Sequence, residues 1–370
     1  MIPYFVLLFI PLLLQTGLQV AKVRLRIGKR GKLVTAQNIA LPMFFVLFSL
    51  LLALRNETIG RDLANYKYLF ASYGITTLSS ILSDPSELVF HLYCWFIYNF
   101  VSQNYQLFLA ITAFLTIIPM ARSYNKDKSH GYLKIAVFVN MSTFIMVFSG
   151  IRQGLAMAAG MLAYQALVDN KLWRYFVWTV IAAFTHHTGF MLLFLLPLCK
   201  IRFRKKDLLW IIPCGLTVVI FNRQIFNVLS LYLGEGSDKY GALASNTGAF
   251  GSLFLFVLFT VFCYVIADET RMDGEAFALR NILTFAAILQ SFALSNSLAM
   301  RMNYYFILLI PMAIGKSLES TREQYWQVAK VGEAVICVFF TLLFVYGTYQ
   351  SYVTGISTLD TIPYVPFWKG

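Results

Sequence analysis

Long apolar runs separated by short basic segments are the feature that most constrains how this chain folds. Each run supplies about 14 to 20 residues, close to the ~20 that a helix needs to cross a hydrocarbon core of ~30 Å. The runs lie at about 1–20, 39–54, 105–121, 132–149, 151–168, 208–222, 251–267, 281–296, 302–315 and 331–349. They predict an all-α integral membrane protein with about 10 full transmembrane helices, organised as one polytopic domain over residues 1–370.

The composition indicates that lipid is the solvent for much of the apolar surface. Of the 370 residues, 59% are hydrophobic and only 13% are charged, whereas a soluble chain carries about a quarter charged residues. The net charge of +13 could suit nucleic acid, but six basic residues crowd into Lys22–Lys32 and five into Lys200–Lys206, each beside an apolar run. Such clusters are typical of cytoplasmic loops, so we expect no nucleic-acid partner.

Two further apolar segments are better explained without a full crossing. Residues 175–199 lie between two basic groups, and both groups stay on the cytoplasmic side if the segment is a re-entrant helical hairpin. Its turn would fall at His186-His187-Thr188-Gly189. Residues 88–101 are interpreted in the same way as an outer or re-entrant helix, which keeps the next basic group inside.

This topology leaves few cations on the outer side and directs both termini outward. The eight outer Lys and Arg are Arg55, Arg61, Lys67, Arg152, Arg223, Lys239, Arg301 and Lys369. Cations placed against the positive-inside bias need a specific reason. We expect the outer loops at about 55–104 and 223–250 to cover a functional site that uses some of them.

The segment Phe148-Ser149-Gly150-Ile151-Arg152-Gln153-Gly154 joins two of the predicted spans almost without a loop. Arg152 therefore begins a helix whose N-terminus faces outward. Helix N-termini offer unpaired N–H groups and the positive end of a dipole, so an added arginine makes an anion site. The alternative is an interfacial arginine whose side chain reaches the lipid headgroups.

Arg301 is placed in the same way, between Ser295 and the apolar run that begins at Met302. A planar guanidinium suits diphosphate because it donates two parallel hydrogen bonds and stays charged. Contact with a lipid headgroup is the alternative here too.

A third candidate segment follows the second span. It runs from Arg55 through Glu57, Gly60 and Arg61-Asp62 to Tyr66, and so concentrates two arginines and two carboxylates around a glycine. An ordinary solvated loop with local ion pairs would look the same, and such pairs contribute little stability.

The adjacent His186 and His187 at the predicted turn are candidates for proton transfer, because histidine exchanges a proton near neutral pH. A hydrogen-bonded packing role is the alternative. Metal binding is not expected, since no Cys, Asp or Glu near them in sequence completes a ligand set. The five cysteines lie in or beside apolar stretches and are interpreted as small buried hydrophobes.

Taken in order, these segments resemble the EpsG family of Wzy-type polysaccharide polymerases, which make exopolysaccharide, capsule or O-antigen. The matching pieces are Arg55…Gly60-Arg61-Asp62…Tyr66, Ser149-Gly-Ile-Arg152-Gln-Gly, His186-His-Thr-Gly-Phe, Arg301…Tyr304-Tyr305 and Pro363-Tyr364. Two departures stand out. Thr188-Gly189 replaces the small pair such as Ser-Ala expected there, and no second clear carboxylate accompanies Arg152.

The resemblance implies a glycosyltransferase in the cytoplasmic membrane of a bacterium. A growing glycan on one polyprenyl diphosphate would pass, outside the membrane, to a sugar hydroxyl on a second lipid-linked repeat unit. The partners would be these donor and acceptor lipids, the bilayer, a chain-length regulator and a flippase. No cofactor is implied.

The expected roles follow from this chemistry, because the leaving diphosphate needs cations and the acceptor hydroxyl gains from a base. We hypothesise that Arg152 and Arg301 hold the diphosphate, with Arg55 or Arg61 helping. His186, or failing that Asp62, would deprotonate or orient the acceptor. Supporting roles are expected for the residues His187, Gln153, Tyr66 and Tyr304.

Other classes of protein could share these features. A flippase for the same lipid-linked sugars would also need cations, but we expect a transporter to carry polar groups at the bilayer midplane. An O-antigen ligase would share the donor site and differ in its acceptor. A structural membrane protein would not require so many outer arginines.

Overall fold

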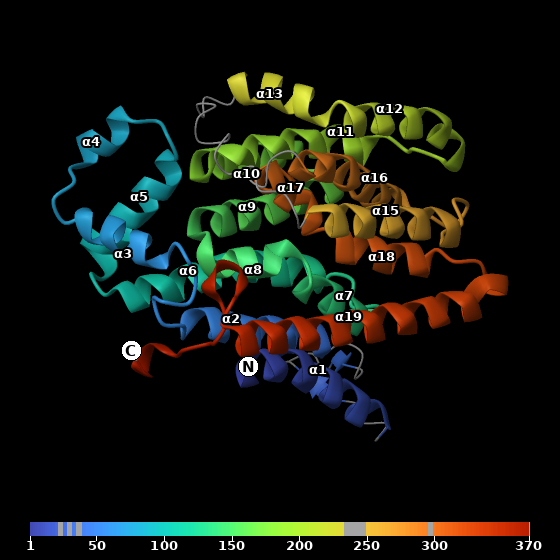
Figure 1. The fold of residues 1–370 in the computed structure, drawn as a ribbon, viewed down its shortest axis with the longest axis horizontal. Helices are drawn as coiled ribbons and strands as arrows, with labels where there is room; N and C mark the ends of the chain where they lie inside the picture. The colour runs from blue at the N-terminus through green and yellow to red at the C-terminus, as the bar shows by residue number, and fades with distance from the viewer. Residues whose placement is uncertain (21–24, 28–31, 35–38, 233–248, 295–298, 370) are drawn as a thin grey trace. The chain divides into compact units, whose positions relative to one another are not determined.

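The computed structural model describes residues 1–20, 25–27, 32–34, 39–232, 249–294 and 299–369 (Figure 1). Much of the basic run Lys22–Lys32, most of the predicted outer loop 223–250 and residues 295–298 lie outside these ranges. The chain divides into two compact units, described separately here: Met1–Phe190 with Gly332–Gly370, and Met191–Val331. That residues 1–370 form a single membrane domain stays a prediction.

The first unit is built from helices. They are α1 (Ile2–Val20), α2 (Ala40–Ala53), α3 (Leu63–Ser72), α4 (Leu78–Ser83), α5 (Leu88–Phe96) with a π-helical turn (Ile97–Val101), α6 (Tyr105–Tyr124), α7 (Gly131–Val139), α8 (Ser142–Ser149), α9 (Ile151–Val168), α10 (Leu172–Thr185) and most of α19 (Trp326–Thr354). The predicted helical class holds, apart from a small antiparallel ladder of β1 (Leu25–Ile27) and β2 (Lys32–Val34).

Helix α9 is the centre of this unit, because it lies against both α6 and α10 (Figure 1). Its small residues allow this close approach: Ala156 and Ala158 are buried, and a Cβ on Gly154 would already touch Thr116 of α6. Helix α5, which precedes α9 and α10 in the sequence, packs on α10. This contact brings residues 87–96 close to the α9–α10 pair. The site described below lies where these helices meet.

The second unit is arranged around α16 (Gly274–Gln290). Its other helices are α11 (Leu195–Lys200), α12 (Leu208–Ile220), α13 (Asn222–Tyr232), α15 (Ala249–Ile266), α17 (Met300–Ile307) and α18 (Ile310–Glu319), with short 3₁₀ turns at Lys205–Asp207, Ser291–Leu294 and Glu323–Tyr325. Arg280 of α16 is fully buried and donates to Glu269 at 2.7 Å. Asn303 ties α17 to α16 by hydrogen bonds of 2.9 Å to Ala286 and Gln290.

Among the described residues, three helices are long and apolar enough to cross a membrane: Tyr105–Tyr124, Gly274–Leu294 and Glu323–Thr354. Several shorter apolar helices accompany them. The predicted count of about 10 full spans therefore remains a prediction. One predicted span, 132–149, is broken into α7 and α8 with a bend of 62°.

The bend in that span has a local cause. Met141 is extended, so the helical hydrogen-bond ladder cannot continue through it. The side-chain amide of Asn140 instead donates at 2.8 Å to the carbonyls of Ala136 and of Phe340 in α19. The hydrogen bonds of Asn140 therefore accompany a break in a helix that the apolar pattern of the sequence predicts to be continuous.

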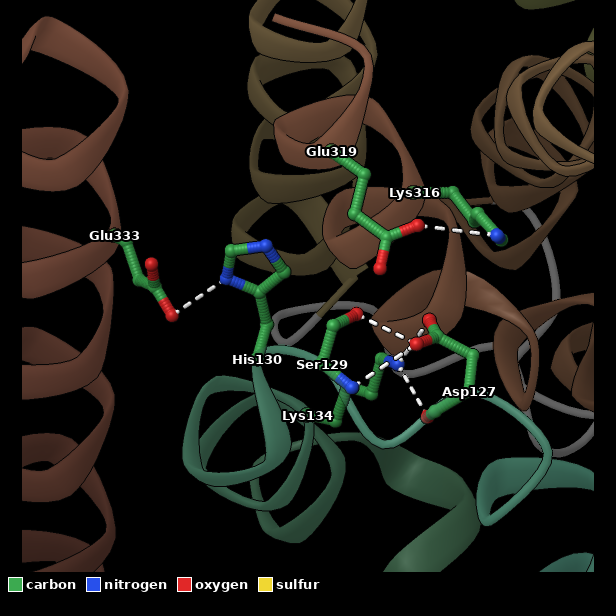
Figure 2. A network of polar contacts seen from close by, with 7 residues as sticks. All are labelled: Asp127, Ser129, His130, Lys134, Lys316, Glu319 and Glu333. Atoms are coloured by element: carbon green, nitrogen blue, oxygen red, sulfur yellow. Dashed lines mark hydrogen bonds and ion pairs between the residues drawn. The ribbon is translucent and has the colours of Figure 1, made fainter. Parts of the chain in front are cut away.

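The start of α7 is fixed by the polar network in Figure 2. Lys134, which is 1% exposed, donates to the Asp127 carboxylate at 2.6 Å, and Ser129 donates to the same side chain at 2.6 Å. His130 Nδ1 lies 2.8 Å from Glu333 Oε1, which links α7 to α19. Figure 2 also draws the Lys316–Glu319 pair of α18, whose charged atoms are 3.0 Å apart.

Candidate functional site

The loop that carries Asp62 closes onto the last residues of α8, directly before α9 begins. Ser149 Oγ donates to Asp62 Oδ2 at 2.8 Å, and the Asp62 backbone N–H donates back to Ser149 Oγ at 3.1 Å. Gly60 permits this approach, because its φ is +121° and a Cβ there would overlap the carbonyl oxygen of Phe148. Two of the sequence segments singled out above are thus in direct contact.

Arg152 occupies the first turn of α9, since the helix begins at Ile151 as predicted. Its Nε donates to the Tyr66 hydroxyl at 3.2 Å, and its Nη1 forms an ion pair with Glu87 Oε2. The guanidinium carbon also stands 5.4 Å from the centre of the Tyr66 ring and 5.5 Å from that of Phe90. The side chain is 36% exposed and so remains accessible to a ligand.

Glu87 is the carboxylate that the sequence did not indicate. It precedes α5 with a left-handed backbone, φ 49°, and its side chain is 7% exposed. While Oε2 contacts Arg152, Oε1 lies 2.5 Å from His186 Nδ1 and 3.7 Å from His187 Nδ1. One carboxylate therefore joins the predicted anion-binding arginine to the predicted proton-transfer histidines.

The two histidines are positioned by the end of α10. The helix stops at Thr185, and His186 is extended with φ −154° and ψ 127°. Gly189 then packs directly on the backbone of Ala182, where any Cβ would overlap main-chain atoms. This explains the small residue at Gly189, and the break falls within the predicted turn. The hairpin over 175–199 itself stays a prediction.

The charge of Glu87 follows from its surroundings. Burial alone would raise the pKa of this carboxyl, but the hydrogen bond from His186, the nearby His187 and the charge of Arg152 outweigh burial and hold the pKa below its usual range. Glu87 is therefore an anion at neutral pH.

The same three groups are the ones that could hold a metal ion. One donor atom from each of Glu87, His186 and His187 lies within 4.8 Å of the others. Glu87, 99 positions from His186 in the sequence, supplies the carboxylate that is missing near the histidines in sequence, and the expectation of no metal stays a prediction. Zn–N and Zn–O bonds of ~2.0–2.1 Å would place tetrahedral donors roughly 3.3 Å apart, whereas the 2.5 Å between His186 Nδ1 and Glu87 Oε1 is a hydrogen-bond distance.

The remaining candidates lie in three kinds of environment. Gln153 is buried and accepts a hydrogen bond of 3.4 Å from Thr188, beside the histidines. Arg55 is 2% exposed and donates to the Val147 carbonyl at 3.1 Å, so it supports the loop from inside. Arg61 is on the surface, 3.2 Å from Asp360.

The C-terminal segment accounts for the Pro363-Tyr364 motif. Tyr364 donates to the carbonyl of Leu51 at 2.8 Å, and the backbone of Asp360 accepts from the Gly60 N–H at 3.2 Å. The segment thereby supports the Asp62 loop. Arg301 and Tyr304 belong to α17 in the second unit, where Tyr304 is buried. Their part in a site with Arg152 stays a prediction.

Apolar helices of membrane-spanning length, together with this buried polar cluster, define a helical integral membrane protein with a candidate anion-binding site. A family model described as the EpsG family matches residues 38–365, and the chain belongs to that family. Membership indicates a role in polysaccharide biosynthesis as a polymerase. Comparisons with curated proteins and with solved structures gave no match.

Proposed function

We propose that the protein polymerises polyprenyl-diphosphate-linked oligosaccharide repeat units by glycosyl transfer at the extracytoplasmic face of a bacterial cytoplasmic membrane. The observation that carries the proposal is the contact of one carboxylate, Glu87, with both Arg152 and His186. A cation for the leaving diphosphate and a base for the acceptor hydroxyl are thereby neighbours in one unit. Both termini would lie outside, as the distribution of Lys and Arg predicts.

Arg152 would bind the diphosphate of the donor lipid. It stands in the first turn of an 18-residue helix, so the helix dipole and the N–H groups of that turn add to its charge. As the glycosidic C–O bond to the diphosphate breaks, negative charge develops on the bridging oxygen, and a preorganised cation stabilises it. Arg301 would assist, with Tyr304 in support. Arg61 remains a further candidate, whereas the buried Arg55 is left out of the binding set.

His186 would act as the base. When its Nδ1–H donates to Glu87, Nε2 carries the lone pair that takes the proton of the acceptor hydroxyl as that oxygen attacks the anomeric carbon. The Glu87 anion stabilises the imidazolium that results. Asp62 is the second candidate, but Ser149 already occupies one of its oxygens at 2.8 Å. His187 and Gln153 would support the acceptor side.

Substitution of Arg152 tests the assignment. We expect Arg152→Ala in detergent-purified protein to reduce polymer formation from defined lipid-linked repeat units by at least ~10²-fold, because one preorganised charge contact on a transition state is worth about that much. Products would be resolved by size. Lys67→Ala is the matched control, since Lys67 is another predicted outer cation and pairs with Glu57 at 2.7 Å on the surface.

The outcomes separate the competing functions. Wild-type chain lengths from the Arg152→Ala protein would refute the role of Arg152. Detergent removes the two compartments between which a flippase moves its substrate. Even a wild-type flippase would therefore not lengthen the glycans in this assay. An O-antigen ligase would transfer a preformed glycan to a different acceptor and leave the repeat units unjoined.

A further inference from the structure

Glu87 has more partners than a structural ion pair needs. Its two oxygens are divided between Arg152 on one side and His186 with His187 on the other. Glu87 is 7% exposed, whereas the Arg152 side chain is 36% exposed. The carboxylate is therefore fixed, and Arg152 is the partner with room to change contacts.

Diphosphate and Glu87 compete for the same guanidinium. A guanidinium binds an anion through two parallel N–H groups, either Nε with Nη2 or Nη1 with Nη2. Nε already donates to Tyr66 and Nη1 to Glu87. Either mode of binding uses a nitrogen that has a partner, and a diphosphate carries more charge than a carboxylate.

We propose that Glu87 is a positioning residue whose contact with Arg152 is exchanged for the donor diphosphate, while its contact with His186 is kept. This inference rests on the proposed function and extends it to the order of contacts within the site. Before the donor binds, Glu87 holds Arg152 in place. Afterwards Arg152 turns to the diphosphate, and the anion of Glu87 serves His186 alone.

The exchange predicts that Glu87→Gln, which removes the charge and keeps the shape of the side chain, strengthens diphosphate binding and slows polymerisation. Arg152 loses its competing anion, so affinity for a diphosphate should rise roughly three- to tenfold. The His186 imidazolium loses its stabilising charge, so the polymerisation rate at saturating donor should fall about 10²-fold. A purely structural role would weaken both properties together.

The experiment uses full-length protein in lipid nanodiscs, with a long-chain polyprenyl diphosphate as the binding probe and lipid-linked repeat units for turnover. Asp84→Asn is the matched control, because it removes one charge three residues away, where Asp84 accepts only a local backbone hydrogen bond of 2.8 Å from Ser86 among the contacts described. We expect no change in affinity or rate for that variant. Weaker probe binding by Glu87→Gln would overturn the exchange.

A second measurement does not depend on the variant folding. A structure of the wild-type protein with bound diphosphate should show Arg152 separated from Glu87, with His186 Nδ1 still on Glu87. A retained Arg152–Glu87 pair would contradict the proposal. So would loss of probe binding by the wild-type protein on addition of EDTA together with metal bound in that structure by Glu87, His186 and His187, which would identify the cluster as a metal centre.

The two proposals fail in different ways. If wild-type protein forms no polymer yet Glu87→Gln binds the probe more tightly, the polymerase function fails and the exchange stands. If polymer forms and the affinity does not rise, only the exchange is wrong.

Discussion

At the scale of single residues, the site depends on backbone positions that admit no side chain. Gly60 has a positive φ, and its Cα faces the carbonyl of Phe148 so closely that a methyl group cannot fit. Gly189 is confined in the same way against Ala182. Each glycine lies two residues from a residue with a proposed role, Asp62 in one case and His187 in the other.

Gly60→Ala should therefore separate the Asp62 loop from the end of α8. The strained φ alone costs about 1–3 kcal/mol, and the overlap with main-chain atoms adds to it. We expect a lower Tm in detergent and loss of polymer formation. Gly347→Ala is the control, because Gly347 lies inside α19 with open space around its Cα and should be neutral or slightly stabilised. Equal Tm values for the two variants would contradict the packing described for Gly60.

Glu87 shows where reasoning from the sequence ends. The first turn of α9, the break at His186 and the Asp62 loop were predicted from local patterns, because helix starts, glycines and paired histidines are local signals. Glu87 contacts Arg152, which is 65 positions away in the sequence, and His186, which is 99 positions away. No local pattern marks such a contact.

At the scale of elements, apolar periodicity predicted where helices lie better than how far each one runs. The prediction for 132–149 missed the bend because it followed hydrophobicity, whereas Asn140 ends α7 by hydrogen-bonding carbonyls of two helices. The outer or re-entrant segment 88–101 is helical, as predicted, and ends in a π-helical turn. Hydrogen bonds of polar side chains thus set where a helix ends inside a segment that the apolar pattern predicts as one helix.

The start of α7 offers a pH-dependent test at this scale. Burial raises the pKa of Asp127, but the charge of Lys134 and its hydrogen bonds with Lys134 and Ser129 outweigh burial and lower the pKa to about 2. A carboxyl with a lowered folded pKa stabilises the protein above its unfolded pKa of ~4, and this contribution is lost as the pH falls toward 2.

Asp127→Asn should consequently lower the Tm at pH 7 by several degrees, because it leaves the buried Lys134 without its counter-charge at a cost of about 1–3 kcal/mol. The difference from wild type should shrink between pH 4 and pH 2. Asp360→Asn is the control, since it removes only an exposed pair with Arg61 and should change the Tm little. A difference that is constant with pH would argue against the ion pair.

At the scale of the whole molecule, the chain consists of two compact units, and each carries one of the two arginines proposed to bind the diphosphate. The family assignment over residues 38–365 covers helices of both units, and the sequence predicted this family from the order of its short motifs. Arg152 and its partners lie in the first unit, and Arg301 lies in the second. We propose that Arg152 binds the diphosphate and that Arg301 assists.

The most direct test of this proposal is photocrosslinking with a polyprenyl diphosphate that carries a photoreactive group beside the diphosphate. We expect labelled peptides from the first turn of α9 and from residues 185–189, a further label near Arg301 in α17, and loss of the first two in Arg152→Ala. Labelling confined to the α6–α7 loop that carries Asp127, or labelling unchanged by Arg152→Ala, would contradict it.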